Sequence, residues 1–286
     1  MWASFADPHH PFDAPEPWSR LHDPADVELP RQRVLDLERR PWWHRASLEG
    51  RPILPENFRK HREKLTHLPV QTEAQTRAMI ANYYGMIALV DHNVGRVLIA
   101  LAEHGLADNT LVIFTTDHGE WLGDHGLVLK GPMAYEGLLR VGFIVRGPGV
   151  PHGKVVHDPI STIDIPATIG DYTGVSIATA IHSRSVRRLV ETDADSRDFA
   201  YSEWGLRASR FGTELDLRTV RTCDAKLTLE RISGAGELYD LSNDPDEMHN
   251  RFDDPGYARK RRELQDMIAS RPSDEMQQRL PQVGMA

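Results

Sequence analysis

The stretch that decides the fold is residues 109–135, NTLVIFTTDHGEWLGDHGLVLKGPMAY. It begins with a short apolar run, Leu111 to Phe114, in which polar and apolar positions do not alternate. Such a run is typical of a strand buried on both faces, and therefore of an interior strand of a parallel sheet. Asp117 and His118 follow where this strand should end, and Lys130 comes later in the same loop. Because loops at the carboxyl ends of parallel strands hold the chemistry of such sheets, we predict a functional site here.

The residues before this strand predict a long helix. Thr72-Glu73-Ala74-Gln75 has the spacing of a capping box, and apolar residues then recur at helical spacing as far as His104. Gly105 supplies a residue that readily adopts the left-handed conformation in which helices often end. Helix, short turn, buried strand and loop together form one unit of a layered α/β sheet.

The ionisable residues of the loop are candidates for a metal site. Asp117 and His118 offer a carboxylate, which suits Ca²⁺, Mg²⁺ or Mn²⁺, and an imidazole, which favours Mn²⁺ or another transition ion. The alternative is that Asp117 caps a helix and that His118 lies on the surface. We interpret Glu120 and Asp124 as acids that order the loop. For His125, a role beside the metal and no role at all both stay open.

Three segments resemble the sulfatase family of the alkaline-phosphatase-like superfamily. Residues 115–150, TTDHGEWLGDHGLVLKGPMAYEGLLRVGFIVRGPGV, look like its metal-and-lysine segment, and GEWLGDHG is also similar to the phosphonate monoester hydrolases of that family. Residues 4–18, SFADPHHPFDAPEPW, resemble its Pro-His-x-Pro-Phe segment. Residues 236–255, GELYDLSNDPDEMHNRFDDP, resemble its C-terminal signature. The resemblance covers nearly the whole chain, but it does not cover a whole sulfatase.

The resemblance and the residue patterns together imply an α/β fold. We expect part of an alkaline-phosphatase-like, mostly parallel sheet flanked by helices, and a small C-terminal α+β subdomain with an antiparallel sheet. Residues 1–175 would form the C-terminal portion of a sulfatase catalytic domain, with an irregular insert over 13–70. Residues 176–198 would be a linker, and residues 199–286 the subdomain.

Local patterns predict the remaining elements. Strands of the main sheet are expected at 2–6, 141–145 and 160–163, followed by a helix with Pro166 in its first turn. In the subdomain, strands are expected at 200–204, 217–223, 225–231 and 237–241, with an amphipathic helix over 257–270.

The resemblance also implies roles for individual residues. Asp117 and His118 would hold a divalent metal, Ca²⁺, Mn²⁺ or Mg²⁺. His9, which matches the family's Pro-His-x-Pro, would face the substrate, whereas His10 falls at the variable position. Lys130 matches the family's Lys-Gly position, where an ammonium would meet an anionic ester oxygen. The implied reaction is hydrolysis of sulfate esters; hydrolysis of phosphonate or phosphate monoesters is the alternative within the same superfamily.

The family's nucleophile is not encoded in this chain. That nucleophile is a Cys or Ser of a Cys-x-Pro-x-Arg type motif, matured to formylglycine, and the motif does not occur here. Cys223 is followed by Asp224 and has neither the Pro nor the Arg. The family's acidic pair after its first strand is also missing. We therefore expect the N-terminal half of the catalytic domain to be absent, and the chain alone to bind metal weakly and to be inactive or weak. A non-catalytic relic or binding module is a further alternative.

Composition narrows the class of protein. The 286 residues are 40% hydrophobic and 27% charged, an ordinary globular balance. A formal net charge of -8 argues against a basic nucleic-acid surface. No uninterrupted apolar run has the length of a membrane span, the first residues do not resemble a signal peptide, and the single cysteine excludes an internal disulfide. The expectation is a cytoplasmic protein that acts on a small anionic ester, with no nucleic-acid or membrane partner and an unknown oligomeric state.

Overall fold

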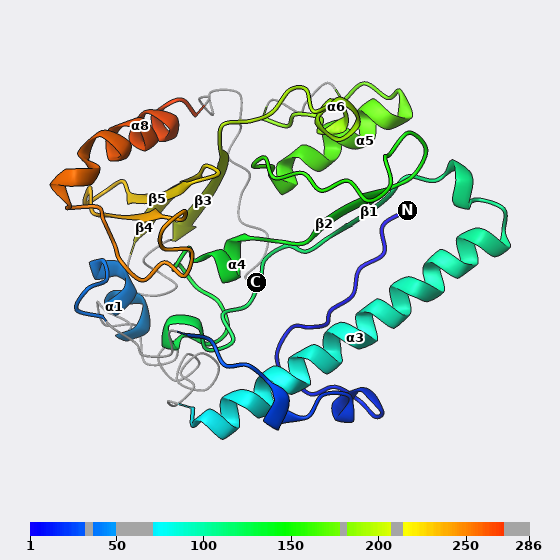
Figure 1. Cartoon of the computed structure of the whole chain (residues 1–286), viewed down its shortest axis with the longest axis horizontal. Coiled ribbons are helices and arrows are strands. Elements are labelled where there is room, and N and C mark those ends of the chain that lie inside the picture. The colour runs from blue at the N-terminus through cyan, green and yellow to red at the C-terminus, as the bar shows by residue number, and fades with distance from the viewer. Residues whose placement is uncertain (32–36, 50–70, 178–181, 207–213, 272–286) are drawn as a thin grey trace.

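A computed structural model describes residues 1–31, 37–49, 71–177, 182–206 and 214–271 of the chain (Figure 1). The helices are α1 (Trp42–Glu49), α3 (Glu73–Glu103), α4 (Glu136–Leu139), α5 (Ile165–Thr173), α6 (Arg187–Thr192) and α8 (Ala258–Ala269). The strands are β1 (Val112–Thr115), β2 (Phe143–Arg146), β3 (Ala200–Leu206), β4 (Leu215–Arg221), β5 (Ala225–Glu230) and β6 (Gly236–Asp240).

The long helix α3 forms as the sequence predicts. The Thr72 side chain accepts the Gln75 N–H while the Gln75 side chain accepts the Thr72 N–H, so the capping box is confirmed. Gly105 follows the helix with a φ of 66°. The buried residues of α3 all lie in its first half: Thr76, Ile80, Ala81, Gly85 and Met86. The second half therefore lies on the surface of this chain.

The length and composition of α3 also fit a membrane span. An 18-residue window of the helix has a mean hydropathy of 1.4, and 11% of that window is buried. The sequence contains no apolar run of this length because the polar residues Asp91 to Asn93 interrupt the helix. The search for a continuous apolar run therefore did not identify α3 as a candidate membrane span. Length and composition alone assign no membrane to α3.

The two described strands of the main sheet pair antiparallel, not parallel. β1 pairs with β2 in the register Val112 with Arg146 and Thr115 with Phe143. All four residues of β1 are half-buried, whereas β2 alternates half-buried and exposed residues, and Ile144 is 63% exposed. An apolar run indicates that both faces of a strand are buried, but it does not indicate whether the neighbouring strand is parallel or antiparallel.

Two other predicted strands of the main sheet are wrong. Residues 2–6 form no strand, and Trp2 is 84% exposed. Residues 160–163 run into a 3-10 turn, Thr162–Asp164, because the Asp164 carboxylate accepts the Ser161 N–H and closes the chain into a turn. Both segments contain apolar residues, but these alone do not provide the partner strand that a β-strand requires. The helix with Pro166 in its first turn is confirmed as α5, which ends before Gly174.

The C-terminal subdomain contains an antiparallel sheet, as predicted, and its strand order is β3-β4-β5-β6. α8 packs against β4 and β5 on one face of this sheet, opposite to the side of the molecule on which α3 lies (Figure 1). The core between them contains Val220, Leu227, Leu238 and Leu264, all fully buried. The expected linker over 176–198 contains α6.

The insert is described only in part. Residues 32–36 and 50–70 of the insert lie outside the described residues. Trp43 at the start of α1 is fully buried against Leu215 and Leu217 of β4. Its neighbour Trp42 remains 42% exposed and donates its indole N–H to Ser233 Oγ at 3.0 Å. The pair thus anchors the insert on the C-terminal subdomain.

Candidate functional site

The residues after β1 bring a carboxylate and an imidazole together. Asp117 Oδ1 accepts the His118 backbone N–H at 2.9 Å, and Asp117 Oδ2 lies 3.7 Å from His118 Nε2. His118 Nδ1 lies 2.7 Å from the Gly119 carbonyl oxygen. Because a carbonyl only accepts, Nδ1 carries the proton and Nε2 presents its lone pair beside the Asp117 carboxylate. The two side chains therefore point to one place, as predicted for ligands of one ion.

The pair fits part of a metal shell. A ligating histidine usually donates its other ring N–H to a carbonyl or carboxylate, which is the arrangement of His118. The Asp117 and His118 side chains are 89% and 38% exposed, so an ion can reach them. Hard divalent cations take roughly six or more ligands. Within the described ranges, no group of three or more His, Cys, Asp or Glu side chains could hold an ion. A complete shell therefore needs ligands that these residues do not provide.

The turn at Gly119 holds the start of the site loop (residues 117–135) against α4. The Gly119 N–H donates to the Leu138 carbonyl at 2.8 Å. A Cβ atom at Gly119 would lie 2.0 Å from the Gly137 carbonyl oxygen, so no other residue fits without moving the backbone. This close approach fixes the backbone immediately after His118.

The two histidines of the N-terminal loop stack on one another. The His9 and His10 ring centroids are 4.1 Å apart, and His10 also contacts the edge of Phe12. Phe12 in turn contacts Tyr83 of α3 edge-on, with centroids 5.5 Å apart. His9 is exposed, and its Nδ1 lies 2.7 Å from the His10 carbonyl oxygen, which leaves Nε2 for a ligand. The aromatic contacts thus tie the exposed His9 to the long helix.

Lys130 lies close to the same group of residues. Burial lowers the pKa of His10, and the charges of His9 and Lys130 lower it further. Burial raises the pKa of Glu120 to about 7, although hydrogen bonds and the Lys130 ammonium act in the opposite direction. Lys130 is half-buried and has no ion-pair partner in the described part of the chain. The structure therefore brings Lys130 and His9 within electrostatic reach of His10, and a positive site results.

No hydrogen bond or ion pair between described residues joins this positive site to the Asp117–His118 pair. The chain itself connects them, since Glu120 follows His118 by two residues and interacts electrostatically with Lys130. The Glu120 carboxylate also accepts the Trp121 N–H at 3.2 Å, which agrees with its interpretation as a loop-ordering acid.

His125 is neither a metal ligand nor a surface residue. It is buried and stacks on Tyr135 with ring centroids 3.7 Å apart, and its Nδ1 lies 3.0 Å from Arg40 Nη2. Burial, and then the Arg40 charge, lower the pKa of His125 to about 3. The ring is therefore neutral and accepts a hydrogen bond from Arg40. The sequence held no signal for this contact, because Arg40 lies in the irregular insert.

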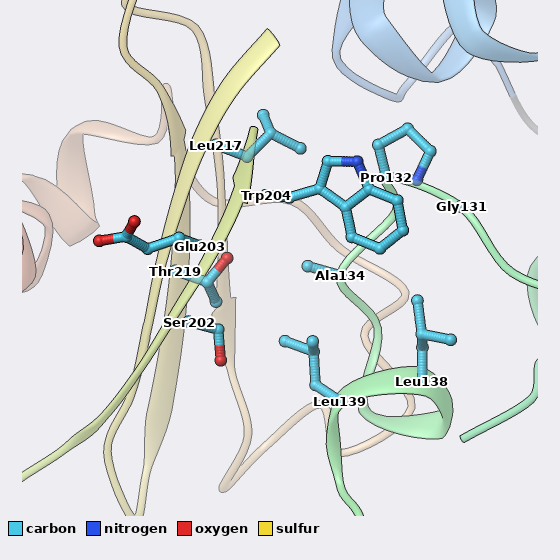
Figure 2. Close-up of a pocket in the computed structure, with 10 residues that line it drawn as sticks. All are labelled: Gly131, Pro132, Ala134, Leu138, Leu139, Ser202, Glu203, Trp204, Leu217 and Thr219. Atoms are coloured by element: carbon cyan, nitrogen blue, oxygen red, sulfur yellow. The ribbon is translucent and has the colours of Figure 1, made fainter. Parts of the chain in front are cut away.

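A small apolar pocket separates the site loop from the C-terminal sheet (Figure 2). Trp204 of β3 and Leu139 of α4 face each other across it, and Gly131 and Pro132 form one wall. Its volume of about 30 Å³ holds one or two water molecules, since one water needs about 10–15 Å³ in the same measure. The pocket is therefore too small for the organic group of a substrate.

Comparison with known proteins identifies relatives of the chain. The family model described as Sulfatase matches residues 1–175, and the one described as N-sulphoglucosamine sulphohydrolase, C-terminal, matches residues 123–274. An arylsulfatase of Clostridium perfringens (strain 13 / Type A) is 30% identical over 262 residues, which cover 90% of this chain and 50% of that protein. The chain spans about half the length of the curated relatives it matches.

Solved structures of two related proteins align with the chain. A phosphonate monoester hydrolase of Agrobacterium radiobacter aligns with a TM-score of 0.75 and 29% identity, over 93% of this chain and 55% of that one. A structure solved in complex with its substrate D-glucosamine-2-N,6-O-disulfate aligns with a TM-score of 0.60 and 27% identity, over 75% and 44%. The predicted α/β class, with its alkaline-phosphatase-like relatives, is confirmed. Since the family model matches more than half of the sequence, the chain belongs to the sulfatase family.

Proposed function

We propose that this chain supplies the metal-and-lysine half of a sulfatase-type site for the hydrolysis of sulfate esters. The observation that carries this proposal is the convergence of Asp117 Oδ2 and His118 Nε2, 3.7 Å apart, at the end of β1. The half-buried Lys130, which lacks a counter-ion in the described part of the chain, supports it from the same loop. A carboxylate, an imidazole and an unneutralised ammonium are the groups that an ester of a strong oxyacid requires.

Each residue has a defined task in this proposal. Asp117 and His118 hold a divalent cation, which would act as a Lewis acid on an ester oxygen. The Lys130 ammonium neutralises the sulfuryl oxygens, where negative charge increases as the ester bond breaks. His9 would present Nε2 to one of these oxygens, because its Nδ1–H is already engaged with the His10 carbonyl, and a doubly protonated ring would donate a hydrogen bond from Nε2.

The nucleophile must come from outside these 286 residues. The sequence holds no Cys-x-Pro-x-Arg motif, and Cys223 lies in the turn between β4 and β5, where its thiol is exposed near the His157 carbonyl. The relatives are about twice as long as this chain, which leaves room in them for the nucleophile and for further metal ligands. We therefore propose that turnover needs a second polypeptide segment.

Exposed apolar side chains support the need for a second segment. They are carried by the N-terminal segment, α3 and β2: Trp2, Phe5, Tyr84, Ile87, Ile99 and Ile144. Soluble proteins rarely leave extended apolar patches uncovered, and such patches mark interaction surfaces. A segment that covers them would also meet the exposed Asp117 and His118.

The substrate class follows from the relatives and remains a proposal. One relative acts on a glucosamine disulfate, which points to sulfated sugars, whereas the phosphonate monoester hydrolases share the highest structural similarity among the relatives described above. A phosphonate or phosphate monoester is therefore the second candidate. Both are tetrahedral anions that the same ammonium and metal could bind.

Hydrolysis of 4-nitrophenyl sulfate and of a 4-nitrophenyl phosphonate tests this function. The purified chain alone should show no more turnover than its Asp117→Ala variant. The chain joined to the part of the Clostridium perfringens arylsulfatase that it does not match should turn over one of the two substrates, and Asp117→Ala or Lys130→Met should remove that activity. Turnover by the chain alone that is lost on Asp117→Ala would show that the site is complete. Complemented turnover that survives both substitutions would remove the proposed roles.

A further inference from the structure

The C-terminal signature places a buried ion pair against the end of the site loop. Lys226 of β5 is 1% exposed, and its ammonium pairs with the carboxylate of Glu247. The same ammonium donates to the carbonyl oxygen of Ala134 and lies 3.9 Å from a Glu136 carboxylate oxygen. The second oxygen of Glu247 accepts the Glu136 backbone N–H at 2.7 Å. Both members of the pair therefore bind the backbone shortly after Lys130, Lys226 at Ala134 and Glu247 at Glu136.

A second set of contacts from the same signature reaches the middle of the loop. Glu237 of β6 accepts the Tyr239 hydroxyl at 2.8 Å, and that hydroxyl accepts Arg40 Nη1 at 2.9 Å. Arg40 donates to His125, and it also donates to the Glu247 backbone carbonyl at 3.3 Å. The signature thus contacts the end of the loop directly and reaches His125, on the other side of Lys130, through Arg40.

The loop backbone needs such external contacts. Three of its non-glycine residues, Leu122, His125 and Leu129, have φ values of 49°, 54° and 69°. Left-handed conformations are unfavourable for these residue types and persist only where the surroundings determine them. Glu247 itself has a φ of 55°, so the residue that holds the loop is also held in an unfavourable conformation.

Stability alone does not account for the Lys226–Glu247 pair. Burial raises the pKa of Glu247, and the Lys226 charge only partly opposes that rise. A buried pair of this kind is often no more stabilising than apolar residues of the same size. What apolar residues could not provide is the donor to the Ala134 carbonyl and the acceptor for the Glu136 N–H.

We propose that Lys226 and Glu247 are positioning residues that form a clamp, fixing the site loop so that Lys130 faces the ester oxyanion. The role of Lys130 rests on the proposed function, but the clamp itself does not. In this proposal, the GELYDLSNDPDE segment couples the C-terminal subdomain to the site loop. Loss of either member leaves a buried charge without its partner and frees one of the two backbone contacts.

Amide hydrogen exchange of the full chain tests the clamp without any need for activity. In Lys226→Met and in Glu247→Met, the amides of Trp121, Gly123 and Glu136 should exchange on the order of tenfold faster or more, while those of Leu227 and Leu229 in β5 change less. The matched control is Lys260→Met, which removes an exposed lysine paired with Asp224 and should leave the site loop unchanged.

The double variant Lys226→Met/Glu247→Met separates positioning from stability. It removes both buried charges, so its melting temperature should recover toward that of the wild type relative to the single variants, while the site loop still exchanges fast. If loop exchange recovers together with the melting temperature, the pair is structural only and the proposal is overturned. The proposal is equally overturned if the single variants speed exchange in the loop and in β5 by the same factor. Neither result bears on hydrolysis, so failure of the clamp is distinguishable from failure of the proposed function.

Discussion

The C-terminal subdomain and the α3 side of the molecule bury their apolar residues very differently. In the subdomain, Val220, Leu227, Leu238 and Leu264 are fully buried between the four-stranded sheet and α8. On the other side, the second half of α3 contributes no buried residue, and Ile144 of β2 is 63% exposed. The subdomain therefore has a core of its own, whereas the α3 side leaves apolar side chains exposed. The Asp117–His118 pair follows β1.

The largest expected effect compares two tryptophans. Trp43 is fully buried against the subdomain, so Trp43→Ala should lower the free energy of unfolding by about 3–5 kcal/mol. Trp2 is 84% exposed, so Trp2→Ala should change it by less than about 0.5 kcal/mol. Urea titrations of both variants measure the difference. Similar losses in the two variants would mean that the two sides are packed alike.

The pH dependence of stability examines the site loop itself. Burial raises the pKa of Glu120 to about 7 in the folded chain, so the stability that Glu120 contributes is present below its unfolded pKa and is lost as the pH rises through 7. Glu120→Gln should therefore stabilise the metal-free chain at pH 8, by on the order of 2 kcal/mol, and have little effect at pH 4. Thermal unfolding at both pH values checks this. An equal effect at the two pH values would contradict the buried environment of the loop.

The cap of α3 should have a moderate effect. Thr72→Ala removes the acceptor for the Gln75 N–H and should cost about 1 kcal/mol. Thr192→Ala is the matched control, because that exposed hydroxyl only donates to a carbonyl within α6 and caps no helix. Denaturation curves that show no difference between the two would mean that α3 unfolds separately from the transition being measured.

Substitutions at exposed apolar positions of α3 should have the smallest effect on stability but should change the self-association of the chain. Ile87→Lys with Ile99→Lys places charges on the exposed face of α3 and should change the unfolding free energy by less than about 0.5 kcal/mol. Light scattering should show less self-association of the isolated chain, because the apolar patch is interrupted. Ile232→Lys, a 63% exposed position in the subdomain, is the control and should leave association unchanged. Equal reductions in all variants would remove the distinction between the two surfaces.

The sequence predicted the local structure well where local signals decide it. The capping box at Thr72, the stop at Gly105, the helix with Pro166 and the β4–β5 hairpin all follow from contacts between residues close in the chain. The segment 2–6 was mispredicted because a strand depends on a distant partner, and a short apolar run does not reveal whether that partner is present.

The sequence indicated Asp117, His118, His9 and Lys130 as candidate site residues, because they follow a strand or match a family segment. The contacts of Lys226 with the loop could not be predicted from the sequence. Nothing in the sequence distinguishes this lysine from an exposed one at the start of a strand, and its burial depends on the tertiary fold. Sequence spacing also gave no reason to pair Arg40 with a histidine 85 positions away.

Titration with Mn²⁺ tests most directly whether the Asp117–His118 pair and the residues Lys130 and His9 form one site. In the NMR spectrum of the isotopically labelled chain, the paramagnetic ion should broaden the signals of all four residues, Asp117, His118, Lys130 and His9, over the same range of ion concentration. The Asp117→Ala variant should abolish all four effects together. If Mn²⁺ broadens His118 but leaves Lys130 and His9 sharp, or instead broadens acidic residues elsewhere on the surface, these residues do not form the half-site described here.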